Sequence, residues 1–319
     1  MPSTSQLRSD SNHLQCSLEQ GPLGPYLQYK SNQEWQKGLN PQQASIQAAV
    51  RIADRYKAPY ILPLSGGIDS EVLARTFLKA DIPFTPLIMK FSAGYNDFET
   101  ANAFRFCQAE NLKAKTLELD LESFFKNEKH LVYAEKYTCR SPQLATHLWM
   151  MEQVPGTFIF PYNPLPLFLS GNKKLYVAFP LKLYHCYDRF FDLNNRDGVG
   201  NFHTYTADLL YSYFQLPLYL EMFFNPDFFK IYCDDQYFLK CELYRSAGFP
   251  VVARKYKATG FEYFRSYLNE KAGRKNSPDY FDEFFRKPME ALSGDFIRHA
   301  YGHLDMESLY FLWRNKDNS

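Results

Sequence analysis

The sequence predicts an α/β protein: a mostly parallel sheet flanked by helices, followed by a mainly helical, aromatic-rich C-terminal part. Between residues 40 and 160, segments with helical spacing of apolar residues alternate with short apolar runs. This alternation is typical of a parallel sheet covered by helices. A glycine-rich turn separates one apolar run from the next helix, and ligands of such folds bind where strands end. After residue 160 the alternation gives way to aromatic helical segments.

Each element of the α/β region has its own signal. Asn40 and Pro41 are suited to the cap and first position of a helix, and Asn96 and Glu99 have the spacing of a capping box. The predicted helices cover residues 40–57, the segment after the glycine turn, 96–112, and a segment that opens at Ser141 and Pro142. The predicted strands cover residues 59–64, 83–91, 113–121 and 156–160.

The rest of the chain has a different pattern. Residues 162–180 contain a turn between apolar runs and predict a hairpin, and residues 194–201 predict a loop. Helices are predicted within 203–247 and over 261–271 and 277–292. The pattern therefore predicts three regions: an N-terminal tail or extension over 1–39, loosely held at its start, an α/β domain over 40–170, and a mostly helical part over 171–319 that completes the site.

Composition narrows the function classes. The formal net charge is +1 without a basic block, so nucleic-acid binding driven by bulk charge is not expected, although a small local patch for RNA stays open. The six cysteines show neither CxxC nor zinc spacing, which predicts buried free thiols in a reducing compartment. The sequence starts without an apolar signal region and contains no apolar run that could span a membrane. We therefore expect a cytoplasmic protein that makes no use of a membrane.

The turn at residues 65–70 reads SGGIDS and follows an apolar strand directly. The start of a helix offers unpaired amides, and Gly66 and Gly67 let those amides approach an anion closely. Ser65 and Ser70 add hydroxyl donors. Asp69 would repel a phosphate unless a cation intervenes, so its presence implies Mg²⁺. The turn is therefore predicted to bind phosphates.

All six positions of this turn match the signature of the PP-loop ATP pyrophosphatases, which the segment resembles. The resemblance implies a Rossmann-like fold of the adenine nucleotide alpha hydrolase type that binds ATP and Mg²⁺. It also implies that adenine lies near the end of the second strand, with the backbone of Met89 as its contact. The residues that the resemblance assigns to ATP are Ser65, Gly66, Gly67, Ile68, Asp69, Ser70 and Met89, with Asp69 also the metal ligand.

Further segments look most like the synthetase domain of asparagine synthetase. Residues 141–152 are similar to its helix before the fourth strand, and residues 254–264 to its late basic loop. The resemblance implies that a substrate oxygen attacks the α-phosphorus of ATP, that pyrophosphate leaves, and that a nitrogen nucleophile then takes the activated group. Lys255 or Lys257 would neutralise the pyrophosphate, with Arg254 as a further candidate.

The chain departs from that branch in two places. No carboxylate stands between Phe158 and Leu169, where those enzymes carry a metal ligand, so Asp97 or Glu99 is the candidate second ligand. The glutaminase half with its cysteine after Met1 is also missing, so ammonia, an amine substrate or a separate partner would supply nitrogen.

Three functions stay open at this point. The first is an AMP-forming, carbon–nitrogen bond-forming ligase that acts on a small acid or an amide-like oxygen. The second is a nucleotide-binding module that has lost its second metal site, and the third is an enzyme that modifies tRNA or a nucleobase. Neither Cys107 nor Cys139 has a neighbouring pair of basic residues that would favour its thiolate, so neither is read as a sulfur carrier. Lone histidines such as His147, His185 and His203 are read as structural, with His203 the one most suited to line a cleft.

Overall fold

The computed structural model describes part of the chain. The described residues are 14–21, 24–31, 34–161, 167–169, 175–178, 181–219, 236–254, 259–274, 279–293 and 299–303. Lys255 and Lys257, the two lysines predicted to neutralise pyrophosphate, lie outside these residues.

A five-stranded sheet, all of whose strands are parallel, forms the centre of the α/β region. Its strands in spatial order are β5 (Lys115–Leu119), β4 (Phe84–Phe91), β3 (Tyr60–Pro63), β6 (Thr157–Ile159) and β9 (Gly198–Val199). The chain runs outward from β3 to β5 and then returns to the other side of β3. The strand order therefore reverses between β3 and β6, and a crevice at the carboxyl ends of strands is expected at such a reversal.

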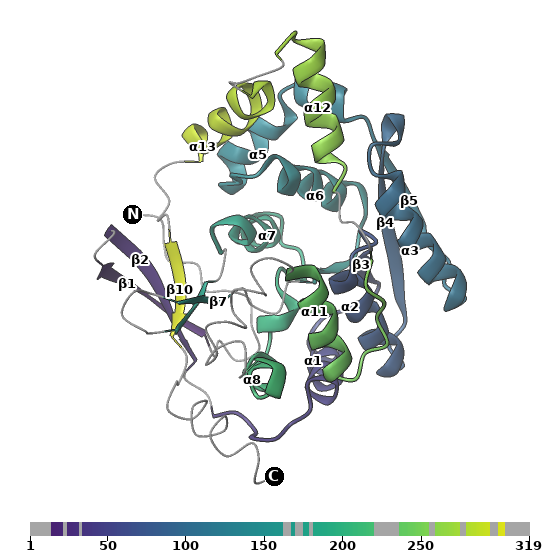
Figure 1. Ribbon diagram of the computed structural model, residues 1–319, viewed down its shortest axis with the longest axis vertical. Helices are drawn as coiled ribbons and strands as arrows, with labels where there is room; N and C mark the ends of the chain where they lie inside the picture. The colour runs from purple at the N-terminus through teal and green to yellow at the C-terminus, as the bar shows by residue number, and fades with distance from the viewer. Residues whose placement is uncertain are drawn as a thin grey trace.

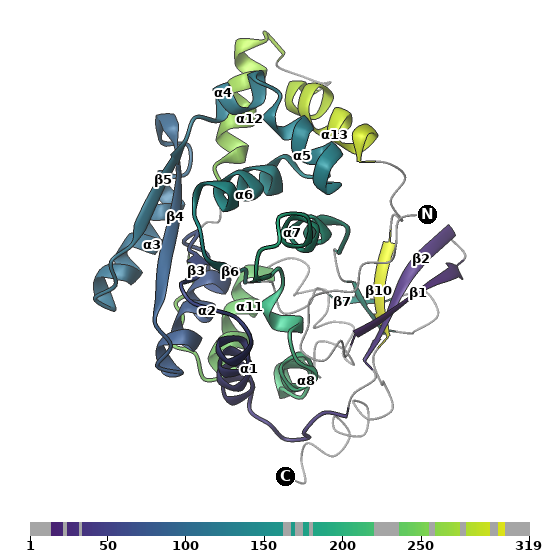
Figure 2. The same cartoon turned by 180° about the vertical axis from the view of Figure 1, so that it is seen from behind.

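Helices cover both faces of this sheet, as Figures 1 and 2 show. Strand residues alternate between two cores: Leu62 and Ile88 belong to one, and Ile61 and Leu87 to the other. The first core holds α1 (Pro41–Arg55), α2 (Ile68–Lys79), α3 (Asp97–Ala109), α8 (Ala207–Phe214) and α11 (Gln236–Ser246). The second holds α4 (Leu121–Lys126), α5 (Lys129–Tyr137), α6 (Pro142–Gln153), α7 (Leu181–Leu193), α12 (Phe261–Lys271) and α13 (Lys287–Leu292). The predicted α/β class is confirmed.

A second sheet lies apart from the first and joins both ends of the described chain (Figure 1). Its order is β1 (Leu14–Gly21), β2 (Gly24–Ser31), β10 (His299–His303), β8 (Leu175–Ala178) and β7 (Leu167–Leu169). The predicted hairpin of residues 162–180 is present as the antiparallel pair β7–β8. Strands β1 and β2, in contrast, pair antiparallel where the sequence predicted an extension with a loosely held start, and β2 also pairs with β10 from the far end of the chain.

Most predicted helices are present, and the elements that the structure adds to the prediction have local causes. Helix α12 has the predicted bounds, and β9 adds a two-residue strand inside the predicted loop at 194–201. Helices α4 and α5 were not predicted. Asp120 was assigned to the preceding strand, yet its carboxylate accepts from the amide of Ser123 at 3.0 Å and so starts α4. Glu128, with a left-handed φ of 55°, separates the two short helices.

Arg196 fixes the turn that leads from α6 into β6, next to the strand-order reversal. Its guanidinium donates to the carbonyls of Val154 at 2.7 Å and Gly156 at 3.1 Å, and also to that of Met151. The same group lies 5.6 Å from the ring centre of Phe158. One arginine therefore satisfies carbonyls at the end of α6 and orients the strand that follows.

We predict that Arg196→Met lowers the free energy of unfolding by about 2–4 kcal/mol, because buried carbonyls lose their donors. Arg189→Met is the matched control, since Arg189 Nε donates to one carbonyl, that of Lys136. Its expected loss is below about 1 kcal/mol. Urea unfolding of both variants measures the difference, and equal losses would contradict this role of Arg196.

Candidate functional site

The glycine turn joins the carboxyl end of β3 to the start of α2, directly beside the strand-order reversal. Gly66 has a φ of +93°, and a Cβ placed there would lie 1.9 Å from the carbonyl oxygen of Glu99. Gly67 is the N-cap of α2. Both the backbone angle and the approach of α3 therefore require glycine at position 66.

Hydroxyl groups hold the turn in shape. Ser65 Oγ accepts from the amide of Gly67 at 3.1 Å, and Ser70 Oγ donates to the carbonyl of Gly67 at 2.8 Å. The amides of Ile68, Asp69 and Ser70 are the first three of the helix, which by geometry have no carbonyl within the helix to bind. These amides and the helix dipole favour an anion at this end of α2.

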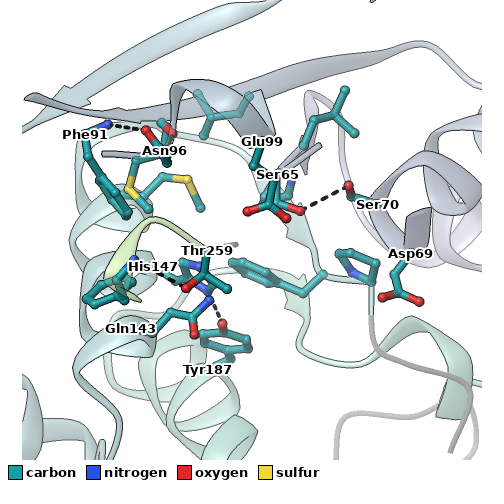
Figure 3. A pocket seen from close by; sticks show the side chains of 18 residues that line it. Ser65, Asp69, Ser70, Phe91, Asn96, Glu99, Gln143, His147, Tyr187 and Thr259 are labelled. Atoms are coloured by element: carbon teal, nitrogen blue, oxygen red, sulfur yellow. Dashed lines mark hydrogen bonds between the residues drawn. The ribbon is translucent and has the colours of Figure 1, made fainter. Parts of the chain in front are cut away.

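A cavity of about 170 Å³ opens beside the turn (Figure 3). Of the six turn residues, Ser65, Asp69 and Ser70 line it, whereas the side chain of Ile68 is buried in the core instead. Its volume is below the roughly 300–1,000 Å³ usual for small-molecule sites. The lining residues are Pro63, Leu64, Ser65, Asp69, Ser70, Leu87, Met89, Phe91, Asn96, Glu99, Gln143, His147, Met150, Phe160, Pro161, Tyr187, Thr259 and Phe261.

Asp69 is held by two side chains of α11, a helix that is distant in sequence. Lys240 forms an ion pair with Asp69 Oδ2, and the Tyr244 hydroxyl donates to Asp69 Oδ1 at 2.6 Å. Burial and the charge of Asp69 raise the pKa of Tyr244 well above its ordinary value, so this hydroxyl stays protonated and donates. Lys240 is itself 8% exposed.

Sequence reasoning did not identify Lys240 or Tyr244. Their spacing of four residues places both on one face of α11, but a lysine and a tyrosine at this spacing are common on a helix that carries other charged residues. The connection to Asp69 exists only in the folded chain. It brings a cation to the turn from α11, whereas the sequence predicted that the cation would come from residues 254–257.

Arg254, the third basic candidate, has a different partner. It forms an ion pair with Glu71 in the first turn of α2, and Glu71 also pairs with Arg75 at 2.8 Å. Among the described residues Arg254 Nη1 is buried and has no hydrogen-bond partner. Arg254 thus lies close to the turn but is not part of the cavity wall.

Glu99 is the second acid of the cavity. It is 8% exposed, lines the cavity, and its Oε1 would lie 3.7 Å from a Cβ placed on Gly67. Asp97, the other acid named from sequence, instead pairs with Lys90 at 3.2 Å and has a side chain that is 56% exposed. Of these two acids, Glu99 is therefore the one that faces the glycine turn.

The predicted capping box of Asn96 and Glu99 does not form. Asn96 caps α3 without a side-chain bond to it; its Oδ1 accepts from the Phe91 amide at 2.8 Å and its Nδ2 donates to the Met89 carbonyl at 2.8 Å. The Asn96 side chain binds the end of β4 because the Phe91 amide and the Met89 carbonyl there need hydrogen-bond partners. The side chain of Met89 lines the cavity, but its carbonyl is already engaged, which restricts the predicted adenine contact.

His147 and Tyr187 form the opposite wall. His147 Nδ1 and the Tyr187 hydroxyl are hydrogen-bonded, and both rings lie close to Phe160. Burial lowers the pKa of His147 to about 4, so the imidazole is neutral at pH 7. The sequence interpretation of His147 as structural therefore misses its place in the cavity wall, whereas His203, expected to line a cleft, packs against Tyr213 and Tyr244 in the core.

The described cysteines agree with the prediction of buried free thiols: Cys107, Cys139, Cys186 and Cys241 are all free and buried. Burial raises the pKa of Cys107, Cys186 and Cys241, which keeps these thiols protonated and weakly reactive. Within the described chain, no helix combines the length and apolar character needed to cross a bilayer.

The acids of the cavity suit a magnesium ion. No group of three or more His, Cys, Asp or Glu side chains with metal-binding geometry occurs among the residues that the structure describes. Mg²⁺, however, is often bound through one or two carboxylates together with substrate phosphates and water. Asp69 and Glu99 are hard oxygen ligands beside a turn that favours phosphate, so the donor set fits this ion.

Comparison with known proteins adds little. No protein-family model matches the chain. No curated protein matches it either. Among solved structures, an NMN synthetase from Francisella tularensis is similar over 76% of this chain and 100% of its own, at 14% identity and a TM-score of 0.31. Similarity at this level supports no inference about activity, which must be argued from the geometry of the site.

We predict that Gly66→Ala destabilises the protein far more than Gly273→Ala. Both glycines have positive φ, but nothing lies within 4 Å of a Cβ on Gly273. Gly273→Ala should cost about 1 kcal/mol of backbone strain, and Gly66→Ala more than about 3 kcal/mol, because its Cβ also meets the backbone of Glu99. Urea unfolding compares the variants, and similar losses would refute the close contact.

Stability should fall as the pH drops from about 6.5 to about 4. The unfolded chain binds a proton at His147 in this range while the folded chain does not, so protons favour unfolding. The contribution of His147 is at most about 3 kcal/mol at a lowered pKa of about 4. His147→Phe should flatten the unfolding free energy against pH; an unchanged slope would contradict a neutral, buried imidazole.

Proposed function

We propose that this protein is an ATP-dependent, AMP-forming enzyme of the PP-loop type that activates an oxygen atom of a small substrate. The observation that carries the proposal is the position of the turn. A glycine-rich turn whose backbone excludes any other residue at position 66 starts a helix at the strand-order reversal, with Asp69 and Glu99 in the adjoining cavity. Strand ends at such a reversal are where α/β folds bind their ligands.

The phosphates of ATP would lie on the amides at the start of α2, with the hydroxyls of Ser65 and Ser70 beside them. Lys240 is a described cation at this turn, because it contacts Asp69. Asp69 and Glu99 would hold Mg²⁺, which neutralises charge on the phosphates when bound. In this arrangement Lys240 shifts from Asp69 to a phosphate oxygen as the nucleotide and the ion enter.

The proposed reaction is the one that the resemblance to PP-loop enzymes implies. A substrate oxygen forms a bond to the α-phosphorus, the bond from that phosphorus to the bridging oxygen of the β-phosphate breaks, and pyrophosphate leaves with the electron pair. A nitrogen nucleophile then bonds to the activated carbon, and AMP leaves. The turn contributes by fixing the phosphates and stabilising the charge that develops on them.

The finer assignment continues the resemblance to asparagine synthetase. Ammonia, an amine or a separate partner would supply nitrogen, and Lys255 and Lys257 remain proposed contacts of the pyrophosphate. The formal net charge of +1 is consistent with a small-molecule substrate in preference to nucleic acid. A cytoplasmic location is part of the same proposal.

A second function has its own support. Both carboxylate oxygens of Asp69 are engaged by α11, as expected of a module that binds a nucleotide without turning it over. The two functions differ in one outcome: ATP binding without any AMP, over a panel of acids and amides, would favour the module.

We predict that the protein releases AMP and pyrophosphate from ATP with a metabolite extract as the acceptor pool. Asp69→Asn and Lys240→Met should each lower the rate by about 100-fold or more, because they remove charge at the reacting phosphates. Asp81→Asn is the matched control, since this acid lies just beyond the other end of α2 and its left-handed backbone, with a φ of 54°, tolerates Asn.

Chromatographic quantification of AMP and pyrophosphate tests the predicted products and the predicted loss of rate in each variant. Full activity in Asp69→Asn would contradict the proposed mechanism. ADP and phosphate as products would show that the enzyme does not form AMP. Thermal unfolding of each variant confirms that a lost rate does not come from a lost fold.

A further inference from the structure

Tyr244, one of the two partners of Asp69 on α11, has a ring that is packed from several directions. The residue is 0% exposed. Its ring centre lies 6.1 Å from that of Tyr213 at 86° and 6.4 Å from that of Phe249 at 90°, and the ring of His203 lies 6.1 Å away. Edge-to-face contacts in a close-packed interior hold a ring in one orientation. The hydroxyl that reaches Asp69 is therefore carried by a fixed ring.

The backbone that carries Tyr244 is anchored as well. The Tyr244 carbonyl accepts from the amide of Phe249 at 2.9 Å, just beyond the end of α11. Gly248, with a φ of +93°, makes the turn between these two residues. The neighbouring Arg245 donates from Nε to the carbonyl of Val251 at 2.9 Å. This end of α11 is thus tied to the segment that follows it.

Lys240 is bound to Asp69 in a different way. Its ammonium group ends a flexible stem of four carbons, and its contact with Asp69 Oδ2 is an ion pair. A phosphate that enters the site attracts the lysine, and a metal ion attracts the carboxylate, so both compete with this pair. The hydroxyl of Tyr244 carries no net charge, and neither ligand competes for it in this way.

The two partners also use different oxygens of the carboxylate. Tyr244 donates to Oδ1 at 2.6 Å, whereas Lys240 contacts Oδ2. An ionised carboxylate has lone pairs for more than one partner on each oxygen, so the bond to Tyr244 can persist while Oδ2 exchanges its partner. Carboxylates that bind metals are themselves oriented by such hydrogen bonds, and losing one typically costs about 10- to 100-fold in metal affinity.

We propose that Tyr244 is a positioning residue for Asp69: it holds Oδ1 with and without ligands and so presents Oδ2 to the divalent ion of a metal–nucleotide complex. This inference rests on the proposed function, in which Asp69 holds Mg²⁺, and adds what orients that ligand. Tyr244 acts through Asp69 alone, since it is not among the residues that line the described cavity.

Binding of ATP with and without a metal tests this role on the full chain. Mn²⁺ serves as the probe in place of Mg²⁺, because water proton relaxation reports the Mn²⁺·ATP complex on the protein. Calorimetry in EDTA gives the dissociation constant of metal-free ATP. The wild-type protein should bind Mn²⁺·ATP more tightly than metal-free ATP. Tyr244→Phe should reduce this advantage by about tenfold or more and leave the affinity for metal-free ATP unchanged.

Tyr213→Phe is the matched control, because Tyr213 belongs to the same ring cluster and its hydroxyl forms no hydrogen bond to Asp69 in the described chain. It should leave both dissociation constants unchanged. Asp69→Asn should remove the advantage that the metal gives. Adding Tyr244→Phe to Asp69→Asn should remove nothing more, because the two residues act as one unit. Thermal unfolding shows whether each variant is folded.

Three results would each overturn the inference: an undiminished metal advantage in folded Tyr244→Phe, an equal loss of affinity for both forms of ATP, or a further loss when Tyr244→Phe is added to Asp69→Asn. None of these contradicts the proposed function, provided that the wild-type protein binds Mn²⁺·ATP. A wild-type protein that binds neither form of ATP would instead refute the proposed function, and this inference with it.

Discussion

The contact between Gly66 and the backbone of Glu99 is the constraint on which the site depends. A turn with a φ of +93° at Gly66 lets α3 approach until no space for a side chain is left. This approach places the Glu99 carboxylate beside the start of α2, where the helix dipole and amides that have no carbonyl partner within the helix favour anions. The same contact therefore brings an anion site and the Glu99 carboxylate together. Because this carboxylate would repel a bound anion, the site then requires a cation.

Charge balance explains the role of α11. Two carboxylates next to an anion site would destabilise it, and the folded chain offsets one of them with Lys240 and the Tyr244 hydroxyl. These partners are nearly buried, so their interaction is only weakly screened by salt. Helix α11, far away in the sequence, therefore engages both carboxylate oxygens of Asp69. Under the proposed function, this contact would link nucleotide entry to the packing of α11.

The sequence predicted local features well and long-range contacts poorly. The strand–turn–helix around Gly66 and the bounds of α12 follow from glycine positions and apolar spacing, and the structure agrees. Lys240 and Tyr244 were missed because their partner lies about 170 residues earlier. The same holds for β1 and β2, whose pairing with β10 unites the two ends of the chain, and for Asn96, whose side chain is bound by β4 rather than by its own helix.

The central claim is that backbone amides at the start of α2 bind the phosphates of a nucleotide. Amide hydrogen exchange tests it most directly, with ATP and Mg²⁺ compared against adenosine at equal occupancy. The account predicts that ATP slows exchange at residues 66–71 and that adenosine leaves these amides unchanged. Protection by ATP at another surface, with residues 66–71 exchanging as in the free protein, would contradict it.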